Sequence, residues 1–207
     1  MSDLINRFAP DFALPAVNGG RVSLSDFRGA VVVLTFWSAE CPWSRRADVL
    51  LVYRSATWGA RGVQLLGVAS NLTETENEIV HELERRDVRY PVVLDKEQAT
   101  ANAYKAQTTP QFFVMDKRGI VRYTGALDDA TFQQPRPQVL YLDRAVNALI
   151  EGKTPDPAIT PPYGCAIVRS VLSEADTSQA PAAPAGKTPA KMPTKPPTKP
   201  PTRPTQP

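Results

Sequence analysis

The sequence predicts an α/β domain in which a mixed β-sheet is covered by helices on both faces. Two strand-like apolar runs enclose one amphipathic helix within residues 30–70, and such a βαβ unit requires parallel strands with a right-handed crossover. A later β-hairpin within residues 111–124 adds antiparallel strands to the same sheet. Apolar residues make up 42% of the 207 residues, which is enough to bury a core.

The first elements follow from local patterns. Segments 11–15 and 21–23 flank the turn Asn18-Gly19-Gly20, which predicts an N-terminal β-hairpin. The run AVVVLTFW at 30–37 is continuously apolar, β-branched or aromatic, as expected of a strand buried on both faces. A helix that ends at Gly59 follows it. Its expected apolar face consists of Trp43, Ala47, Leu50, Leu51 and Trp58.

The remaining elements alternate between strands and helices as far as residue 150. Strands are expected at 63–70, 91–94, 111–116 and 120–124, the last two joined by turn residues 117–119. Helices are expected at 74–86, 98–104 and 139–150.

Composition divides the chain into three parts. A compact domain spans residues 1–151, and a Pro-rich extension at 152–176 carries Cys165. The segment 177–207 holds ten of the 21 prolines and five basic residues but no acidic one, and it has too few apolar groups to offset the entropy of ordering. We expect it to be a disordered tail. Without those five basic residues the rest of the chain carries about −2, which gives no argument for nucleic-acid binding.

The sequence shows no targeting, membrane or metal signal. The longest apolar run, at 30–34, is far shorter than the roughly 18 residues of a membrane span, and the first ten residues lack the pattern of a signal peptide. We therefore expect a cytoplasmic protein. The single histidine, His81, and two distant cysteines give no metal-ligand spacing, so neither a metal nor another cofactor is expected.

Cys41 is the residue best placed for chemistry. It follows the buried strand by four residues and directly precedes the predicted helix. At a helix N-terminus, unpaired N–H groups and the helix dipole stabilise a thiolate and lower its pKa. Pro42 suits the first helical turn, and Arg45, within one turn, would add positive potential. The alternative is a buried and unreactive cysteine.

Three segments resemble the thioredoxin superfamily. FWSAECPWS at 36–44 resembles its active-site loop, Thr109-Pro110 with the following QFFVMDKRG resembles its cis-proline loop and hairpin, and 9–37 resembles its redoxin branch. That branch holds the AhpC/TSA-type peroxiredoxins and the thioredoxin-like disulfide reductases. The resemblance covers about residues 8–151 and implies a thioredoxin fold. It also implies that Pro110 is cis and faces Cys41, so that the Thr109 backbone can pair with an incoming peptide or disulfide.

Two positions depart from the family patterns. Dithiol thioredoxins carry a second cysteine where this chain has Ser44, so a CxxC disulfide is impossible, and the Ser44 hydroxyl is expected only to donate to the thiolate. Peroxiredoxins usually carry proline where this chain has Leu34, although Ser38 fits their pattern. The resemblance to peroxiredoxins also gives Arg122 the place of an arginine that faces the reactive cysteine. The alternative is an ordinary exposed strand arginine.

Cys165 is the only other thiol in the chain. Two-cysteine peroxiredoxins similarly place a resolving cysteine in a C-terminal segment, which implies that Cys165 attacks an oxidised or mixed-disulfide form of Cys41. The alternatives are an unrelated free thiol and a residue that only packs against the domain.

These residues predict an enzyme, a thiol-dependent oxidoreductase that uses the Cys41 thiolate to reduce peroxides or to exchange disulfides. The expected partners are a peroxide or protein disulfide and an external thiol reductant, and the chain acts either alone or as a dimer. The lack of a CxxC pair favours peroxide chemistry, whereas the cis-proline loop favours protein-disulfide exchange. The alternative is a non-enzymatic thioredoxin-fold binding module that is tethered by its basic Pro-rich tail.

Overall fold

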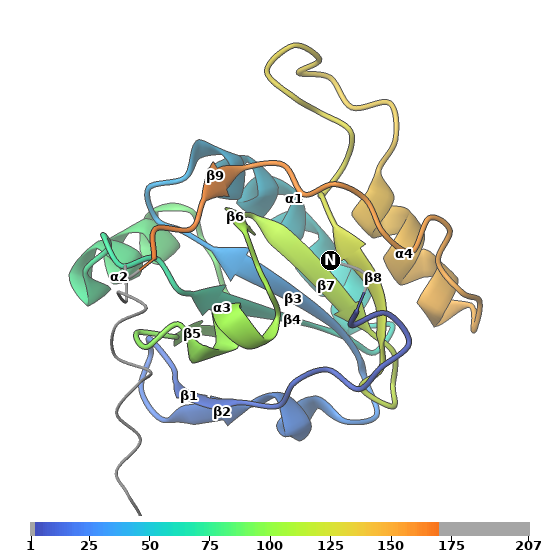
Figure 1. The fold of residues 1–207 in the computed structure, drawn as a ribbon, viewed down its shortest axis with the longest axis horizontal. Helices are drawn as coiled ribbons and strands as arrows, with labels where there is room; N and C mark the ends of the chain where they lie inside the picture. Colours follow the sequence, from blue (N-terminus) through green and yellow to red (C-terminus); the bar gives the residue numbers. More distant parts are fainter. Residues whose placement is uncertain (1–2, 170–207) are drawn as a thin grey trace, which may run out of the picture. The chain divides into compact units, whose positions relative to one another are not determined.

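A five-stranded mixed sheet with the strand order β5–β4–β3–β7–β8 forms the centre of the fold (Figure 1). Strands β3 (Val31–Trp37), β4 (Val63–Ala69) and β5 (Val92–Leu94) are parallel. Strand β7 (Gln111–Met115) pairs antiparallel with β3, and β8 (Val121–Gly125) pairs antiparallel with β7. The expected mixed sheet is confirmed. The structure is a computed structural model that describes residues 3–169, so the tail predicted at 177–207 lies outside the described residues.

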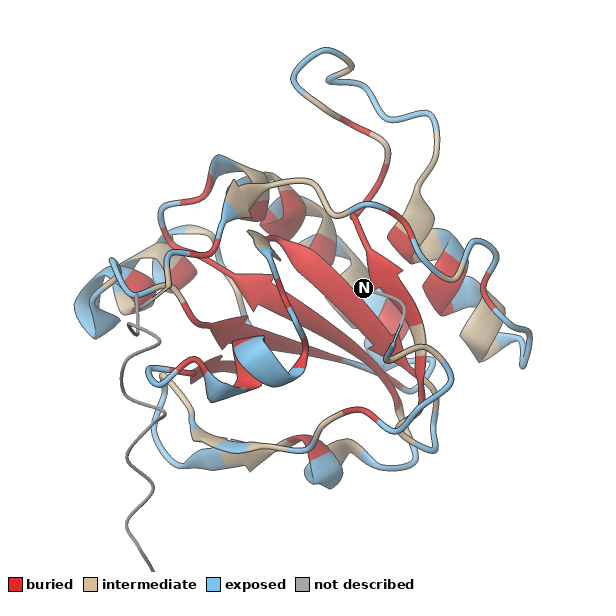
Figure 2. Cartoon of the chain, in the orientation of Figure 1, coloured by how far each residue is buried: buried red, intermediate tan, exposed pale blue. Residues whose placement is uncertain are grey.

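Both faces of the sheet are covered, because strand side chains alternate between them. Helices α1 (Pro42–Gly59), α2 (Glu76–Arg85) and α4 (Tyr141–Ile150) contribute to one core cluster, together with Val31, Val33 and Trp37 of β3. The short helix α3 (Ala99–Ala103) lies on the other face. There the N-terminal hairpin of β1 (Ala13–Pro15) and β2 (Arg21–Ser23) and the 3₁₀ helix η1 (Leu24–Phe27) also pack. Figure 2 shows the buried strands between these more exposed layers.

The buried face of α1 differs from the expected apolar stripe. Ala47, Leu51 and Trp58 are buried as expected, and Leu50 is partly buried. The other buried residues of this helix are polar, namely Ser44 and Asp48. Trp43 lies outside both core clusters, in a position described below.

Two strands of two residues each were not anticipated from the sequence. Strand β6 (Thr108–Thr109) immediately precedes Pro110, and β9 (Cys165–Ala166) lies in the C-terminal extension. They pair antiparallel, with Thr109 opposite Cys165. The extension therefore returns to the domain, and it is also held upstream, where Ile159 pairs with Thr124 of β8. No helix within residues 3–169 is both long enough and apolar enough to cross a membrane.

Candidate active site

Cys41 lies where the loop after β3 enters α1. Its backbone is extended, with φ −77° and ψ 120°, and it caps the helix whose first residue is Pro42. The first N–H groups of a helix have no partner within the helix, so the Cys41 side chain faces the positive end of the dipole. The side chain is almost fully enclosed, since Cys41 is only 2% exposed.

Two other segments meet the Cys41 sulfur. Cys41 Sγ lies 2.8 Å from the Thr109 carbonyl oxygen, to which it donates when protonated, and 2.8 Å from the Cys165 sulfur. The Thr109–Pro110 bond is cis. The fold thus brings together four of the residues that the sequence singled out: Cys41, Thr109, Pro110 and Cys165.

The two thiols differ in acidity because of their surroundings. Burial acts to raise the pKa of Cys41, but hydrogen bonds from the Cys165 thiol and from the Ser44 main-chain N–H outweigh it and lower the pKa below the usual value. Burial raises the pKa of Cys165, and contact with Cys41 raises it further. Cys41 is therefore the more acidic thiol of the pair, and Cys165 is the less acidic one.

Gly164 allows this close approach of the two chain segments. A Cβ atom at this position would lie 2.1 Å from the Thr109 carbonyl oxygen and 2.7 Å from its carbon, both shorter than any van der Waals contact. Any side chain at position 164 would therefore move β9 away from β6 and from Cys41.

A carboxylate holds the loop that presents Cys41. Glu74 accepts hydrogen bonds from the Ser38 hydroxyl and from the main-chain N–H groups of Ala39, at 3.1 Å, and Glu40, at 3.3 Å. The Ser38 hydroxyl in turn accepts from the Cys41 N–H at 3.1 Å. The main-chain donors of this turn are thus satisfied before the helix begins.

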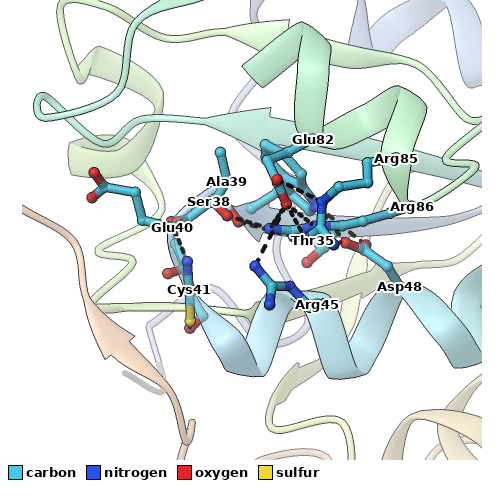
Figure 3. A network of polar contacts seen from close by, with 12 residues as sticks. Thr35, Ser38, Ala39, Glu40, Cys41, Arg45, Asp48, Glu82, Arg85 and Arg86 are labelled. Carbon is cyan, nitrogen blue, oxygen red and sulfur yellow. Dashed lines mark hydrogen bonds and ion pairs between the residues drawn. The ribbon is translucent and has the colours of Figure 1, made fainter. Parts of the chain in front are cut away.

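A buried ion pair lies behind the same loop (Figure 3). Arg86 Nη1 lies 3.0 Å from Asp48 Oδ2, and both side chains are at most 4% exposed. Asp48 also accepts from the Trp37 indole and from the Tyr90 hydroxyl. The Arg86 guanidinium donates to the carbonyl oxygens of Ser38 and Ala39, so the charges are fully paired and joined to the active-site loop.

This network was missed in the sequence. One feature of the sequence could have indicated a buried Asp48. It lies one residue after Ala47 and three before Leu51, and this spacing places it on the buried face of α1. Glu82 extends the network toward solvent, where hydrogen bonds from Arg85 and Arg86 lower the pKa of its carboxyl to about 2.

The three residues expected to stabilise the thiolate with their side chains do not do so. The Ser44 hydroxyl is buried with no hydrogen-bond partner among the described residues, and only the Ser44 main-chain N–H acts on Cys41. The Arg45 guanidinium points to Glu82 at 3.7 Å instead (Figure 3). Arg122 pairs with Asp116 at 2.9 Å. Strand β8 places Arg122 near the start of β3, whereas Cys41 follows the end of β3, so the two residues lie at opposite ends of the sheet.

Three aromatic side chains form a cluster beside the cysteines. The Trp43 ring packs edge-to-face against Tyr163 at 4.8 Å and against Phe132 at 5.2 Å between centroids. Phe132 is 79% exposed. Trp43 therefore packs against the extension and not into the core. Phe132 and Tyr163 were missed because nothing local in the sequence connects them to Cys41.

Two known relatives are disulfide oxidoreductases. The chain is 32% identical to the thiol-disulfide oxidoreductase ResA of Geobacillus kaustophilus over 55% of this chain, and the match spans just under two thirds, 64%, of that protein. It is 30% identical to ResA of Geobacillus thermodenitrificans over 61% of this chain and 72% of the relative. These relatives support redoxin-type disulfide exchange and do not point specifically to peroxide reduction.

Solved structures agree with this fold. An uncharacterised conserved protein from Geobacillus kaustophilus superposes with a TM-score of 0.76 at 27% identity, covering 81% of this chain and 93% of that one. A thioredoxin-family thiol:disulfide interchange protein from Chlorobium tepidum superposes with a TM-score of 0.57 at 23% identity, covering 69% and 95%. The expected thioredoxin fold is confirmed. The AhpC/TSA family model matches residues 5–124, more than half of the sequence, and the chain therefore belongs to the AhpC/TSA family.

Proposed function

We propose that this protein is a thiol-disulfide oxidoreductase in which Cys41 is the nucleophile and Cys165 is the resolving cysteine. The observation that carries the proposal is the 2.8 Å separation of the two sulfurs, in a chain whose CxxC position is filled by Ser44. The second thiol thus comes from the C-terminal extension and not from the first turn of α1.

The first step is attack of the Cys41 thiolate on one sulfur of a substrate disulfide. A bond forms between Cys41 Sγ and that sulfur, and the other substrate sulfur leaves as a thiolate and takes up a proton. The lowered pKa of Cys41, caused by the Cys165 thiol and the Ser44 N–H in spite of burial, increases the fraction of the nucleophilic thiolate at a given pH.

The second step is attack of Cys165 on Cys41 Sγ. The Cys41–Cys165 disulfide forms, and the substrate leaves as its second thiolate. Besides burial, contact with Cys41 raises the pKa of Cys165 in the resting pair. Because Cys41 carries no charge in the mixed disulfide, that contribution disappears at the step in which Cys165 must lose its proton.

An external thiol reductant then reduces the Cys41–Cys165 disulfide and closes the cycle. Protein disulfides are the proposed substrates, with Thr109 and Pro110 forming the loop against which a substrate lies. Both thiols come from one chain, so the cycle does not require a dimer.

The test compares the unaltered protein with Cys41→Ser and Cys165→Ser in two assays, reduction of insulin disulfides and turnover of hydrogen peroxide. We expect insulin reduction to be lost in Cys41→Ser, and Cys165→Ser to accumulate as a mixed disulfide with substrate. Oxidation of the unaltered protein should give a 41–165 disulfide in a peptide map. Full insulin reduction by Cys41→Ser would overturn the role of Cys41, absence of both activities in the unaltered protein would favour a binding module, and turnover of peroxide alone would make the protein a peroxidase.

A further inference from the structure

The loop between β4 and α2 contacts both segments that carry a cysteine. Asn71 Oδ1 accepts from the Val168 N–H at 2.7 Å, and the Leu72 N–H donates to the Val168 carbonyl at 3.4 Å. The Asn71 side-chain amide donates in turn to Glu74 Oε1 at 3.1 Å. This loop follows the carboxyl end of β4, beside the carboxyl end of the parallel strand β3 that leads to Cys41. It therefore joins the C-terminal extension to the active-site turn.

Cys165 is held on both sides along the segment of residues 163–168, which we call the strap. Two residues before the cysteine, Tyr163 packs edge-to-face on Trp43 at 4.8 Å between centroids. Three residues after it, Val168 makes the hydrogen bonds to the loop described above, and β9 lies between these two points (Figure 1). Because the Val168 side chain is 44% exposed, the position of this residue depends on its main-chain hydrogen bonds and not on burial.

A single side chain connects the strap to the turn of Cys41. Asn71 donates to Glu74, and Glu74 accepts from the Ser38 hydroxyl. That hydroxyl accepts from the Cys41 N–H at 3.1 Å. Asparagine suits the first place in this chain, because one carboxamide carries both an acceptor for the Val168 N–H and a donor for a carboxylate. Consecutive hydrogen bonds therefore join the end of the strap to the main chain of Cys41.

We propose that Asn71 is a positioning residue that brings Cys165 to Cys41 Sγ in the second step of the cycle. This inference rests on the proposed function and names what regulates that step at the same site. Once Cys41 is joined to a substrate, Cys165 must return to within reach of Cys41 Sγ, and a thiol held there reacts as if its concentration were very high. The hydrogen bond between Val168 and Asn71 forms as the strap returns, so it favours the second step and has no part in the first.

The first experiment follows the full-length reduced protein with an equimolar amount of dithiobis-nitrobenzoate, which releases thionitrobenzoate in two phases. In the first phase the Cys41 thiolate attacks the reagent, bonds to one of its sulfurs and expels one thionitrobenzoate. In the second phase the Cys165 thiolate attacks Cys41 Sγ, the 41–165 disulfide forms and the second thionitrobenzoate leaves. Only the first rate depends on concentration, so the two steps are measured separately in one reaction.

Asn71→Ala should slow the second phase at least about fivefold, which is the effect of losing one hydrogen bond, and should leave the first phase no slower. The reaction is run above about pH 8.5, the ordinary pKa of a cysteine, so that Cys41 is predominantly a thiolate in every variant. Asn147→Ala is the matched control, because it also removes an asparagine that accepts a hydrogen bond, from Arg61 at 3.3 Å on an exposed surface. Equal second-phase rates in the two variants would overturn the inference.

A second pair of variants removes the same hydrogen bond from the side of the strap. Val168→Pro takes away the N–H that donates to Asn71 and leaves the loop and the turn of Cys41 unaltered. Val168→Ala keeps the N–H and is the control. We expect Val168→Pro to slow the second phase about as much as Asn71→Ala does, and the two changes together to slow it no further than either alone. Additive losses would show that the two residues act separately, against the proposal.

The pH dependence of the second-phase rate distinguishes positioning from a change in acidity. The rate rises as Cys165 loses its proton, and Asn71→Ala should lower the plateau at high pH without moving the midpoint. A moved midpoint with an unchanged plateau would assign Asn71 to the acidity of Cys165 and contradict the proposal.

Failure of the proposed function gives a different result, because the unaltered protein would then release one thionitrobenzoate per chain instead of two. Two phases in the unaltered protein, with rates that neither Asn71→Ala nor Val168→Pro changes, would leave the proposed function standing and refute this inference alone.

Discussion

The sulfur of Cys165 lies 2.8 Å from that of Cys41, although 124 residues separate the two in sequence. Two contacts create this proximity: the pairing of β9 with β6, and the absence of a side chain at Gly164. A strand from the C-terminal extension thereby supplies the thiol that the first turn of α1 lacks.

The pKa of Cys41 should depend on its partner. Hydrogen bonds from the Cys165 thiol and the Ser44 N–H lower it in spite of burial, so alkylation with iodoacetamide should show a midpoint below about 8.5. Cys165→Ala removes the donor and should raise this midpoint, whereas Cys165→Ser keeps a donor and should raise it less. Equal midpoints in both variants and the unaltered protein would exclude Cys165 as the donor.

The same pKa shift gives a dependence of stability on pH. Because the pKa of Cys41 is lower in the folded state than in the unfolded one, its contribution to stability is fully present above about 8.5 and is lost as the pH falls through the lowered pKa. Urea unfolding of the reduced protein as a function of pH, compared with Cys41→Ser, isolates this contribution. A difference between the two proteins that does not change across that interval would speak against the lowered pKa.

Two serines near Cys41 should respond differently to replacement by alanine. The buried Ser44 hydroxyl has no partner among the described residues, so Ser44→Ala should change the free energy of unfolding by less than about 1 kcal/mol. Ser38→Ala removes one of the donors to Glu74 and leaves the Cys41 N–H without its partner, and it should cost about 1–3 kcal/mol. Chemical denaturation measures both, and a larger loss in Ser44→Ala would show that its hydroxyl is bonded after all.

Removing one charge of the buried ion pair should be strongly destabilising. Arg86→Met leaves Asp48 without its cation in the protein interior, which costs about 3–5 kcal/mol. The neighbouring Arg85→Met is the control: its side chain is 46% exposed, and the change should cost less than about 1 kcal/mol. Similar losses in the two variants would show that the Arg86–Asp48 pair does not hold the loop.

Two glycines should give opposite results when changed to alanine. Gly125 has φ +150°, and a Cβ atom there would lie 2.0 Å from Thr160 Oγ1. Gly125→Ala should therefore destabilise the domain and release the extension at Thr160, whose hydroxyl accepts from the Ala126 N–H. At Gly59, the last residue of α1, a Cβ atom meets nothing within 4 Å, and Gly59→Ala should stabilise by about 0.5–1 kcal/mol. Melting temperatures of the two variants on the same side of the unaltered protein would contradict this.

The sequence by itself determined the order of elements and the place of Cys41. A run of β-branched and aromatic residues specifies β3, and a largely apolar run specifies β4. Turn residues specify both hairpins, and the strand–loop–helix order puts Cys41 at the start of α1. These are local effects: backbone preference, side-chain periodicity and the unpaired N–H groups of a first helical turn. They depend only on neighbouring residues, so they can be predicted before any tertiary contact is known.

Only the tertiary structure decided which side chains surround the sulfur. Arg122 fitted a family position but pairs with Asp116 at the other end of the sheet, whereas the uncharged Cys165 returns to Cys41 through β9. Asp48 is buried because Arg86, 38 residues later, meets it. Which distant segments meet depends on the free energy of the contacts between them and on the entropy lost in closing the chain between them. The local sequence pattern contains neither quantity.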